Sequence, residues 1–579
     1  MAKTPFEEDN QPKEGHTVEP SVFLLEPPDT PMLKNLKSYL NQSIARGDTM
    51  ELPSLENHKN GVSINKQLKT EKDVLSSAYE YLVEKEDRRS LAQFFTHKEL
   101  VRFILSHIPI NGQSLILDPA CGAGAFLIEA YNEVRNLDNI FGIDIDETAV
   151  QLSKLNIQLI AQKVPKNIKL ANTLKCDILQ VFPDVKRNGG FDIVVGNPPF
   201  QNLEQDVGYY KSESIYSQVL NGIANSATLM IAKGFECLKE GGYLGFVLPK
   251  NMMRVKSFEK LRNFIINNTK LIYIYDLDHY FKDVRGDQII LIFQKKKLES
   301  DEFKKHKTTF LIYRKGSDFS HPYKYEVPQS EFLKYDFFPV FYDNSIFPFA
   351  DLLLKLKPTL NDVCDGNIFR GLNLGANSEL ISKNSSGSSR VIFRGDSIRR
   401  FGIKYPLYID ITKLNGLEKN KIKRLQTNKI ILQNICSKEG GIFAALSNPD
   451  ELSLDTVTNI VSTKLNLKYL VGVLNSKITN LFIILIVFLN SNFTMHTDRE
   501  YIGRIPIILP TAEQEKLVIE IVERILKMKD YYSKEFFDEY KELNNVLFDI
   551  YGFNQSQKES INEMLNVNMS RKQNGKQNE

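Results

Sequence analysis

The stretch Asn197-Pro198-Pro199-Phe200 holds the side chains with the clearest chemical potential in this chain. The two prolines fix the backbone φ angle and donate no N–H, so the Pro198 carbonyl is held in one direction. This carbonyl and the Asn197 side-chain oxygen can therefore converge as two hydrogen-bond acceptors. With the flat ring of Phe200 beside them, they suit a planar ligand that bears an –NH2 group. The alternative is an ordinary turn at the end of a strand, where Asn and Pro are common.

An acidic residue and a glycine-rich turn lie upstream of this stretch. Asp118 ends an apolar run, and the turn 119–124 leads into the next predicted helix. Glycines in such a turn let the backbone approach a ligand closely, and the N–H groups of the helix face the same crevice. The turn does not complete a dinucleotide fingerprint, because Leu127 replaces the third small residue. Asp118 would also repel a pyrophosphate, so a cation or an ammonium group fits better.

Two further carboxylates follow at strand ends and extend this pattern. Asp144 ends the second predicted strand, where a carboxylate can hold two ribose hydroxyls. Asp177 follows the third strand, where it can accept a hydrogen bond from an adenine amino group. S-adenosylmethionine has an ammonium, a sulfonium, a ribose diol and an adenine, so it matches the whole set. Each carboxylate alone is more often a solvated loop residue or a helix cap.

The elements that position these residues alternate between strands and helices. Hydrophobic periodicity predicts strands at 114–117, 139–145, 169–173, 191–195, 242–247, 271–277 and 288–293, and helices at 125–134, 147–161, 227–238 and 257–267. This order predicts an α/β fold with a doubly wound, mostly parallel sheet. The last two strands follow each other closely and predict an antiparallel edge.

The motifs between residues 90 and 295 resemble those of the amino-group DNA methyltransferases. Phe94-Phe95-Thr96-His97 is similar to the family's motif that closes over the methionine end of the cofactor, with Thr96 as the carboxylate contact. Thr96 could alternatively cap the following helix, with Glu99 at the third helical position. The place of this motif before the glycine turn, and the large extra region after the sheet, are similar to the TaqI-like gamma class.

This resemblance implies a class I S-adenosylmethionine-dependent methyltransferase fold, which is Rossmann-like, with S-adenosyl-L-methionine as cofactor and no metal. The catalytic residues it implies are Asn197, Pro198 and Phe200. The cofactor-binding residues it implies are Phe95, Thr96, Asp118, Ala120, Gly122, Gly124, Asp144, Ile145, Asp177 and Asn197. An aromatic residue between the last two strands, Phe281 with Tyr280 as second choice, is implied to stack on the target base opposite Phe200. For both, a core aromatic at a strand end is the alternative.

The resemblance also implies the reaction and its partners. The expected reaction moves the methyl group of the cofactor to N6 of a flipped-out adenine in a short, palindromic site of double-stranded DNA. The expected setting is a restriction system with a separate restriction endonuclease, and the enzyme acts as a monomer or weak dimer. The alternatives are cytosine N4 methylation, usually with Ser in place of Asn197, methylation of RNA or of protein glutamine, a fused nuclease, and a non-catalytic nucleic-acid-binding protein.

The regular alternation ends near residue 345. We expect an N-terminal arm at 1–70, a catalytic domain at 71–345, an α+β target-recognition domain at 346–565 and a disordered tail at 566–579. Segment 391–430 holds ten Lys/Arg and three Asp/Glu residues, which predicts contacts to DNA phosphates. A solvated charged surface is the alternative. The expected DNA-binding residues are Arg394, Arg399, Arg400, Lys421, Lys423 and Arg424. A helix with a capping box at Thr511 and Gln514 is expected to close the folded part.

The composition excludes several other classes of protein. The net charge is only +3, and 42% hydrophobic with 25% charged residues is ordinary for a globular protein. Five cysteines and eight histidines are widely spaced, so no zinc site is expected, and the thiols are expected to be reduced in the cytoplasm. The longest apolar run, Leu481–Leu489, is nine residues and too short to span a bilayer, so it predicts a buried element.

Overall fold

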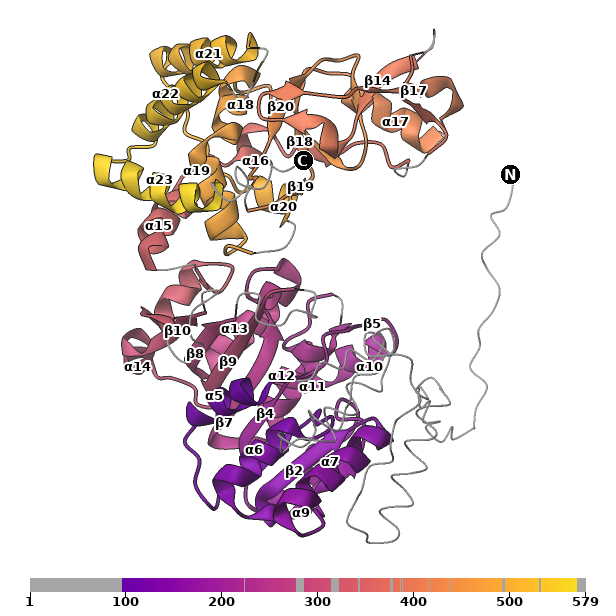
Figure 1. Ribbon diagram of the computed structural model, residues 1–579, viewed down its shortest axis with the longest axis vertical. Coiled ribbons are helices and arrows are strands. Elements are labelled where there is room, and N and C mark those ends of the chain that lie inside the picture. Colours follow the sequence, from indigo (N-terminus) through magenta and orange to yellow (C-terminus); the bar gives the residue numbers. More distant parts are fainter. Residues whose placement is uncertain are drawn as a thin grey trace, which may run out of the picture.

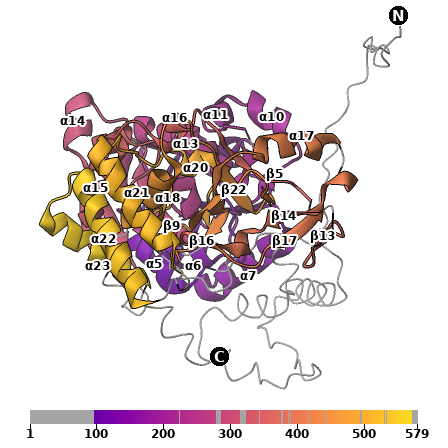
Figure 2. The ribbon, with the colours of Figure 1, turned by 90° about the horizontal axis from the view of Figure 1, so that it is seen from above.

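The computed structural model describes residues 96–222, 224–277, 286–313, 322–341, 344–374, 378–385, 387, 389–414, 416–438, 440–491, 495–528, 530 and 533–569. Figure 1 shows two parts, one built on a large sheet and one that holds the C-terminal half of the chain. From above, the C-terminal part lies over the sheet part (Figure 2). The expected arm at 1–70 lies outside the described residues.

The first part is built on a nine-stranded sheet with the order β11-β10-β8-β9-β7-β4-β1-β2-β3. Strands β3, β2, β1, β4 and β7 pair in parallel with their neighbours, while β9 runs antiparallel to both β7 and β8. The expected α/β fold with a mostly parallel sheet is therefore confirmed. The strand bounds are β1 Ile116–Asp118, β2 Ile140–Asp144, β3 Ile168–Leu170, β4 Phe191–Gly196, β7 Leu238–Pro249, β8 Lys270–Asp276, β9 Gln288–Gln294, β10 Lys307–Ile312 and β11 Tyr323–Pro328.

Helices cover both faces of this sheet. Successive residues of a strand point to opposite faces, so the apolar residues of one strand pack against helices on both sides. Ile193 and Val195 of β4 belong to one hydrophobic cluster, and Val194 between them belongs to the other. Residues of α5, α6 and α7 lie in the first cluster, and residues of α12 and α13 lie in the second. The helix bounds are α5 Lys98–Ser106, α6 Ala125–Val134, α7 Glu147–Ala161, α12 Ser226–Cys237 and α13 Glu259–Asn268.

The predicted antiparallel edge is wrong in one respect. Strands β8 and β9 do pair antiparallel, but β10 adds in parallel to β8 and β11 then pairs antiparallel with β10. The edge of the sheet is therefore β11. The sequence of β10, Lys-Thr-Thr-Phe-Leu-Ile, lacks a clear alternation of apolar and polar residues, so its pattern does not reveal a strand.

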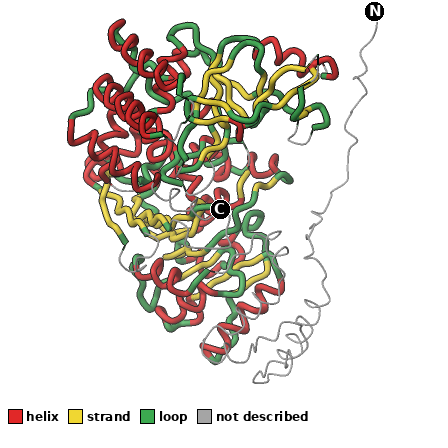
Figure 3. The backbone as a smooth tube through the Cα atoms, turned by 45° about the horizontal axis from the view of Figure 1, so that its top comes forward, coloured by secondary structure: helices red, strands yellow, loops and turns green. Residues whose placement is uncertain are grey.

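The C-terminal half holds two four-stranded sheets, with orders β12-β22-β18-β20 and β13-β17-β14-β21. Most of its helices gather on one side (Figure 3), whereas helix α17 (Gly416–Leu425) lies beside strands β14 and β17 (Figure 1). The last strand of the large sheet ends at Pro328 and β12 begins at Ile368, so the proposed boundary near residue 345 falls between the sheets. The strand bounds here are β12 Ile368–Arg370, β13 Ile381–Ser382, β14 Ser389–Phe393, β17 Leu407–Asp410, β18 Lys429–Gln433, β20 Ala444–Ser447, β21 Leu452–Ser453 and β22 Val457–Ile460.

The capping box at Thr511 and Gln514 is confirmed at the start of α21 (Ala512–Leu526). This helix does not close the fold, however, because α22 (Lys534–Ile550) and α23 (Gln555–Met569) follow it. Since α23 continues past residue 565, residues 566–569 belong to a helix and not to the expected tail; residues 570–579 lie outside the described part.

The long apolar run is buried, as expected. It forms a π-helical segment, Leu481–Val487, that follows α18 (Leu467–Asn475) and α19 (Lys477–Asn480). Among the described residues, no single helix is long and apolar enough to cross a membrane. Only the segments 467–475 and 477–487 reach that length and apolarity when taken together, and they are bent by 55° relative to each other. All seven residues of the π-helical segment are buried inside the protein.

Candidate functional site

Asp118, Asp144 and Asn197 lie at the carboxyl ends of three neighbouring strands. Asp118 ends β1, Asp144 ends β2, and Asn197 directly follows β4. Strand β1 has β2 on one side and β4 on the other, so the strand order changes direction here. Crevices that hold ligands open at such switch points in parallel α/β sheets.

The glycine turn between β1 and α6 is fastened to the end of β2. Asp144 Oδ2 accepts a hydrogen bond from the Gly122 N–H at 2.8 Å, and Cys121 N donates to the Ile143 carbonyl at 2.9 Å. Gly124 has φ +94° at the start of α6, and a Cβ atom there would lie 2.7 Å from Ser153 Oγ on α7. Glycine is thus required at 124 by both backbone conformation and space.

Asp118 lies between this turn and the strand that leads to Asn197. Its side chain is buried, and Oδ1 accepts a hydrogen bond from the Ala120 N–H at 3.0 Å. On the other side, a Cβ atom at Gly196 would lie only 2.7 Å from Asp118 Oδ1. Because residue 196 has no side chain, the Asp118 carboxylate fits directly beside it, one position before Asn197.

Burial gives both carboxyl groups unusual acidities. It raises the pKa of Asp118 to about 8, with the negative charge of Asp144 adding to the effect. Burial likewise raises the pKa of Asp144 to about 6, against the hydrogen bonds from Asp146 and Gly122 that lower it. Neither group forms a salt bridge within the described part of the chain. A buried and a half-buried acid without a cationic partner fit a cofactor that brings its own ammonium and hydroxyl groups.

Asn197 is oriented by Thr96, the residue predicted to contact the cofactor carboxylate. The Asn197 amide nitrogen Nδ2 donates to Thr96 Oγ1 at 3.1 Å, so the amide oxygen Oδ1 is the acceptor on its other branch. The alternative role for Thr96, as a helix cap, is wrong. Helix α5 begins at Lys98, its N-cap residue is His97, and no side chain caps it.

The loop after Asn197 is held by Ser226, which the sequence analysis did not single out. The buried Ser226 hydroxyl donates to the Pro199 carbonyl at 2.6 Å and accepts from the Gln201 N–H at 2.9 Å. Ser226 N also donates to the Gln201 carbonyl at 2.8 Å. Because Ser226 is the first residue of α12, 26 positions beyond Phe200, only the fold brings it to this loop.

The other predicted residues of this site differ in their surroundings. Asp177 is exposed and caps α8 (Ile178–Val181), because its Oδ1 accepts hydrogen bonds from Leu179 N and Gln180 N. The alternative role of this carboxylate as a helix cap is thus present. Ile145 is 59% exposed, Pro198 is buried, and Phe200 packs partly buried against the core. Phe95, Tyr280 and Phe281 lie outside the described residues. Among those that are described, no cluster of His, Cys, Asp and Glu could hold a metal ion.

The six basic residues predicted to bind DNA differ in their surroundings. Arg394 pairs with Asp396 at 3.2 Å, and Arg399 donates to the carbonyls of Asp396 and Ile398 at 2.6 and 2.9 Å. The Arg400 guanidinium lies 4.7 Å from the ring centre of Tyr540 on α22. All three arginines are thus engaged by neighbouring groups of the protein.

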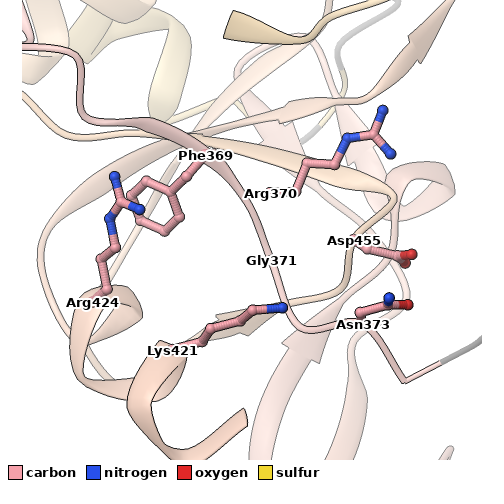
Figure 4. Close-up of a pocket in the computed structure, with 7 residues that line it drawn as sticks. All are labelled: Phe369, Arg370, Gly371, Asn373, Lys421, Arg424 and Asp455. Atoms are coloured by element: carbon pink, nitrogen blue, oxygen red, sulfur yellow. The ribbon is translucent and has the colours of Figure 1, made fainter. Parts of the chain in front are cut away.

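The remaining three lie on helix α17 (Gly416–Leu425). Lys421 and Arg424 line a cavity of about 360 Å³. The other residues that line it are Phe369, Arg370, Gly371, Asn373 and Asp455 (Figure 4). Lys421 and Arg424 were predicted from the sequence, but Asn373 and Asp455 carried no signal.

Comparisons with known proteins find relatives for both halves of the chain. Residues 138–281 match the family model described as Eco57I restriction-modification methylase, and residues 390–507 match the TaqI-like C-terminal specificity domain. The Type II methyltransferase M.VspI of Vibrio sp. (strain 343) is 26% identical over 210 residues, which are 36% of this chain and 49% of the relative. The Type I restriction enzyme MjaIX methylase subunit of Methanocaldococcus jannaschii is 27% identical over 280 residues, 45% of this chain and 48% of the relative. The chain thus spans about half the length of these curated relatives.

Among solved structures, the Type IIL restriction-modification enzyme MmeI in complex with DNA is similar over 88% of this chain and 78% of its own, with a TM-score of 0.56 and 15% identity. At that identity the likeness concerns the fold alone, and it extends over both halves. The family matches and the curated relatives together relate the chain to the restriction-modification methylases of types I and II.

Proposed function

From this relation to the restriction-modification methylases, we propose that the chain is an S-adenosylmethionine-dependent DNA methyltransferase that modifies N6 of adenine. The observation that carries the proposal is the position of Asn197. It follows β4 at the switch point of the sheet, with the buried Asp118 beside Gly196 and with its amide oriented by Thr96. This arrangement places an oriented amide oxygen next to a site suited to a cationic cofactor.

The proposed chemistry is mostly positioning. S-adenosylmethionine, when bound, supplies the methyl group. Asn197 Oδ1 and the Pro198 carbonyl accept hydrogen bonds from the two N–H groups of the target amine. These bonds reduce the sharing of the nitrogen lone pair with the ring and direct it toward the methyl donor. Cytosine N4 methylation uses the same chemistry, but Asn197 favours adenine.

The cofactor would be held by the edge of the sheet and the glycine turn. We assign Asp118, Gly122 and Gly124 to its methionine part and Asp144 to its ribose. Asp177 uses Oδ1 to cap α8, so Oδ2 is the atom we assign to the adenine amino group. Ala120 and Ile145 adjoin these residues in the chain and complete the proposed lining.

The proposed substrate is double-stranded DNA, read mainly by the C-terminal half. An amino group inside a duplex cannot reach Asn197, so the base must be flipped out, at a cost of a few kcal/mol. Phe200 would stack on the flipped base, and Phe281 or Tyr280 is predicted on its other face. The resemblance to TaqI-like enzymes leads us to predict a palindrome containing TCGA as the site. A palindrome is methylated once per strand, so a monomer suffices, and a separate restriction endonuclease is the predicted functional partner.

Transfer of tritium from labelled S-adenosylmethionine tests this function. DNA, RNA and protein are offered separately, and the modified product is digested to identify the methylated group. We expect N6-methyladenine in DNA. N4-methylcytosine, methylated RNA or methylglutamine would each replace the proposal with one of its alternatives.

Two variants test the assigned roles. Asn197→Ala should bind DNA and cofactor but transfer almost no methyl, because it removes one of the two acceptors. Asp144→Ala should lose cofactor affinity in a direct binding measurement. Substantial methyl transfer by Asn197→Ala would contradict the proposed role, and unchanged cofactor affinity of Asp144→Ala would remove the ribose assignment.

A further inference from the structure

We propose that the cavity beside α17 reads the edges of one G·C base pair, with Arg424 contacting guanine and Asp455 contacting cytosine. This inference rests on the proposed function, since it names a part of the DNA that the C-terminal half would recognise. The cavity lies between the stretch 369–373, helix α17 and Asp455 (Figure 4).

Arg424 is held in a fixed orientation with its donors available. Its guanidinium carbon lies 3.7 Å from the ring centre of Phe369, so the plane of the side chain is supported by a cation–π contact. Within the described residues, Arg424 donates no hydrogen bond and forms no salt bridge. An arginine held in this way can present two N–H groups side by side, the arrangement that matches O6 and N7 of guanine.

Asp455 and Asn373 supply acceptors on the other side of the cavity. Asp455 is half-buried, and no described residue forms a salt bridge or a hydrogen bond with its carboxylate. Asn373 is exposed, and within the described part of the chain only its backbone N–H forms a hydrogen bond, which Glu418 accepts at 3.3 Å. A carboxylate in the major groove accepts a hydrogen bond from the N4 amino group of cytosine.

The charge balance of the cavity argues against a phosphate as its ligand. Arg370 forms two hydrogen bonds to Asp498, at 2.7 and 2.8 Å, and Lys421 pairs with Glu418 at 3.2 Å. Among the residues that line the cavity, one negative charge, Asp455, and one positive charge, Arg424, then remain, so the lining itself has no excess of positive charge. A phosphate would be repelled by Asp455 and gain little from cations that are already paired. The edge of a base pair needs both donors and acceptors, and the cavity offers both.

The floor of the cavity is stiff enough to discriminate between bases. A Cβ atom at Gly371 would lie 2.1 Å from the Ser453 carbonyl oxygen, so the two backbone segments are in direct contact. Asp498, which holds Arg370, also accepts a hydrogen bond from Asn434 at 3.2 Å. Sites whose supporting groups are locked in this way hold their side chains in one geometry.

The test compares the sequence preference of variants of the full chain. The wild-type protein first methylates mixed-sequence DNA, and the modified positions define its recognition site. Methylation rates are then measured on that site and on every variant with one base pair changed, for wild type, Arg424→Ala, Asp455→Asn and Lys423→Ala. Lys423 lies on the same helix but does not line the cavity, so it is the matched control.

The wild-type protein should prefer one G·C pair over the other base pairs at that position. We expect this preference to fall roughly ten- to a hundredfold in both Arg424→Ala and Asp455→Asn. Lys423→Ala should weaken binding equally on all sequences and reduce its salt dependence. The inference is overturned if the site contains no G·C pair, if the two variants leave discrimination unchanged, or if they weaken all sequences equally. Circular dichroism and cofactor affinity of each variant exclude misfolding, and the milder Asp455→Asn decides the case if Arg424→Ala is unstable. A wild-type protein that methylates no DNA would instead refute the proposed function itself.

Discussion

Replacing Ser226 by Ala should slow methyl transfer without weakening substrate binding. The Ser226 hydroxyl connects the first turn of α12 to the loop that carries Asn197 and Pro198, through Pro199 O and Gln201 N. The variant removes both hydrogen bonds but keeps the one from Ser226 N to the Gln201 carbonyl. The loop therefore stays attached, but it is held less firmly in one place.

The size of the effect follows from these two bonds. Each buried hydrogen bond contributes about 0.5–1.5 kcal/mol, so their loss weakens the seating of the loop by roughly 1–3 kcal/mol. If this energy holds the acceptors in place at the transition state, kcat falls by roughly five- to a hundredfold, since about 1.4 kcal/mol corresponds to a factor of ten. The KM values for DNA and cofactor should change little, because Ser226 is buried and its hydroxyl bonds only backbone atoms of the loop among the described residues.

Thr228→Val is the matched control for this experiment. Thr228 is also buried on α12, and its hydroxyl has no hydrogen-bond partner among the described residues. Steady-state kinetics and thermal unfolding are measured for both variants. We expect Thr228→Val to keep its kcat, while Ser226→Ala loses it at a temperature well below its unfolding transition. A Ser226→Ala variant with wild-type kcat, or equal losses in both variants, would refute the positioning role.

Three further predictions concern the buried carboxyl group and its neighbours. Because the pKa of Asp118 is about 8, binding of the cofactor's ammonium group should release close to one proton from Asp118. The cofactor affinity should therefore fall nearly tenfold per pH unit from about pH 7.5 to 6, and Asp118→Asn should lose this pH dependence. Titration calorimetry in two buffers measures both the proton release and the affinity. The same raised pKa means that the folded chain keeps a proton that the unfolded chain releases above about pH 4. The unfolding free energy should thus decrease between pH 4 and 8, and chemical denaturation should show no such contribution in Asp118→Asn. Gly196→Ala would bring a Cβ atom to 2.7 Å from Asp118 Oδ1, so it should destabilise the protein by about 1–3 kcal/mol and weaken cofactor binding. Gly208→Ala is the control, because a Cβ atom there has no neighbour within 4 Å, and it should change neither stability nor cofactor binding.

Helices of the first part were predictable where local signals agree with burial. The helices expected at 125–134 and 147–161 have those bounds in the structure, because a glycine turn or an Asp cap fixes each start and a regular apolar pattern follows. Strand β10 was missed because pairing with β8 stabilises it more than its own pattern does. The contact of Thr96 with Asn197, 101 residues away in the chain, was also not predictable, because the sequence offered only a cofactor contact or a helix cap for Thr96.

The sequence by itself determined the residues of the proposed chemistry: the stiffened Asn197 stretch, the glycine turn and the acids at the ends of strands. These follow from local rules, since prolines restrict their own backbone and apolar runs define where strands end. Only the tertiary structure decided which side chains support them. Ser226 contacts Pro199, Gly196 leaves room for Asp118, and Asp455 lines the same cavity as Arg424, because strand pairing and packing bring distant segments together. Such contacts depend on the whole fold and produce no periodic pattern in the sequence.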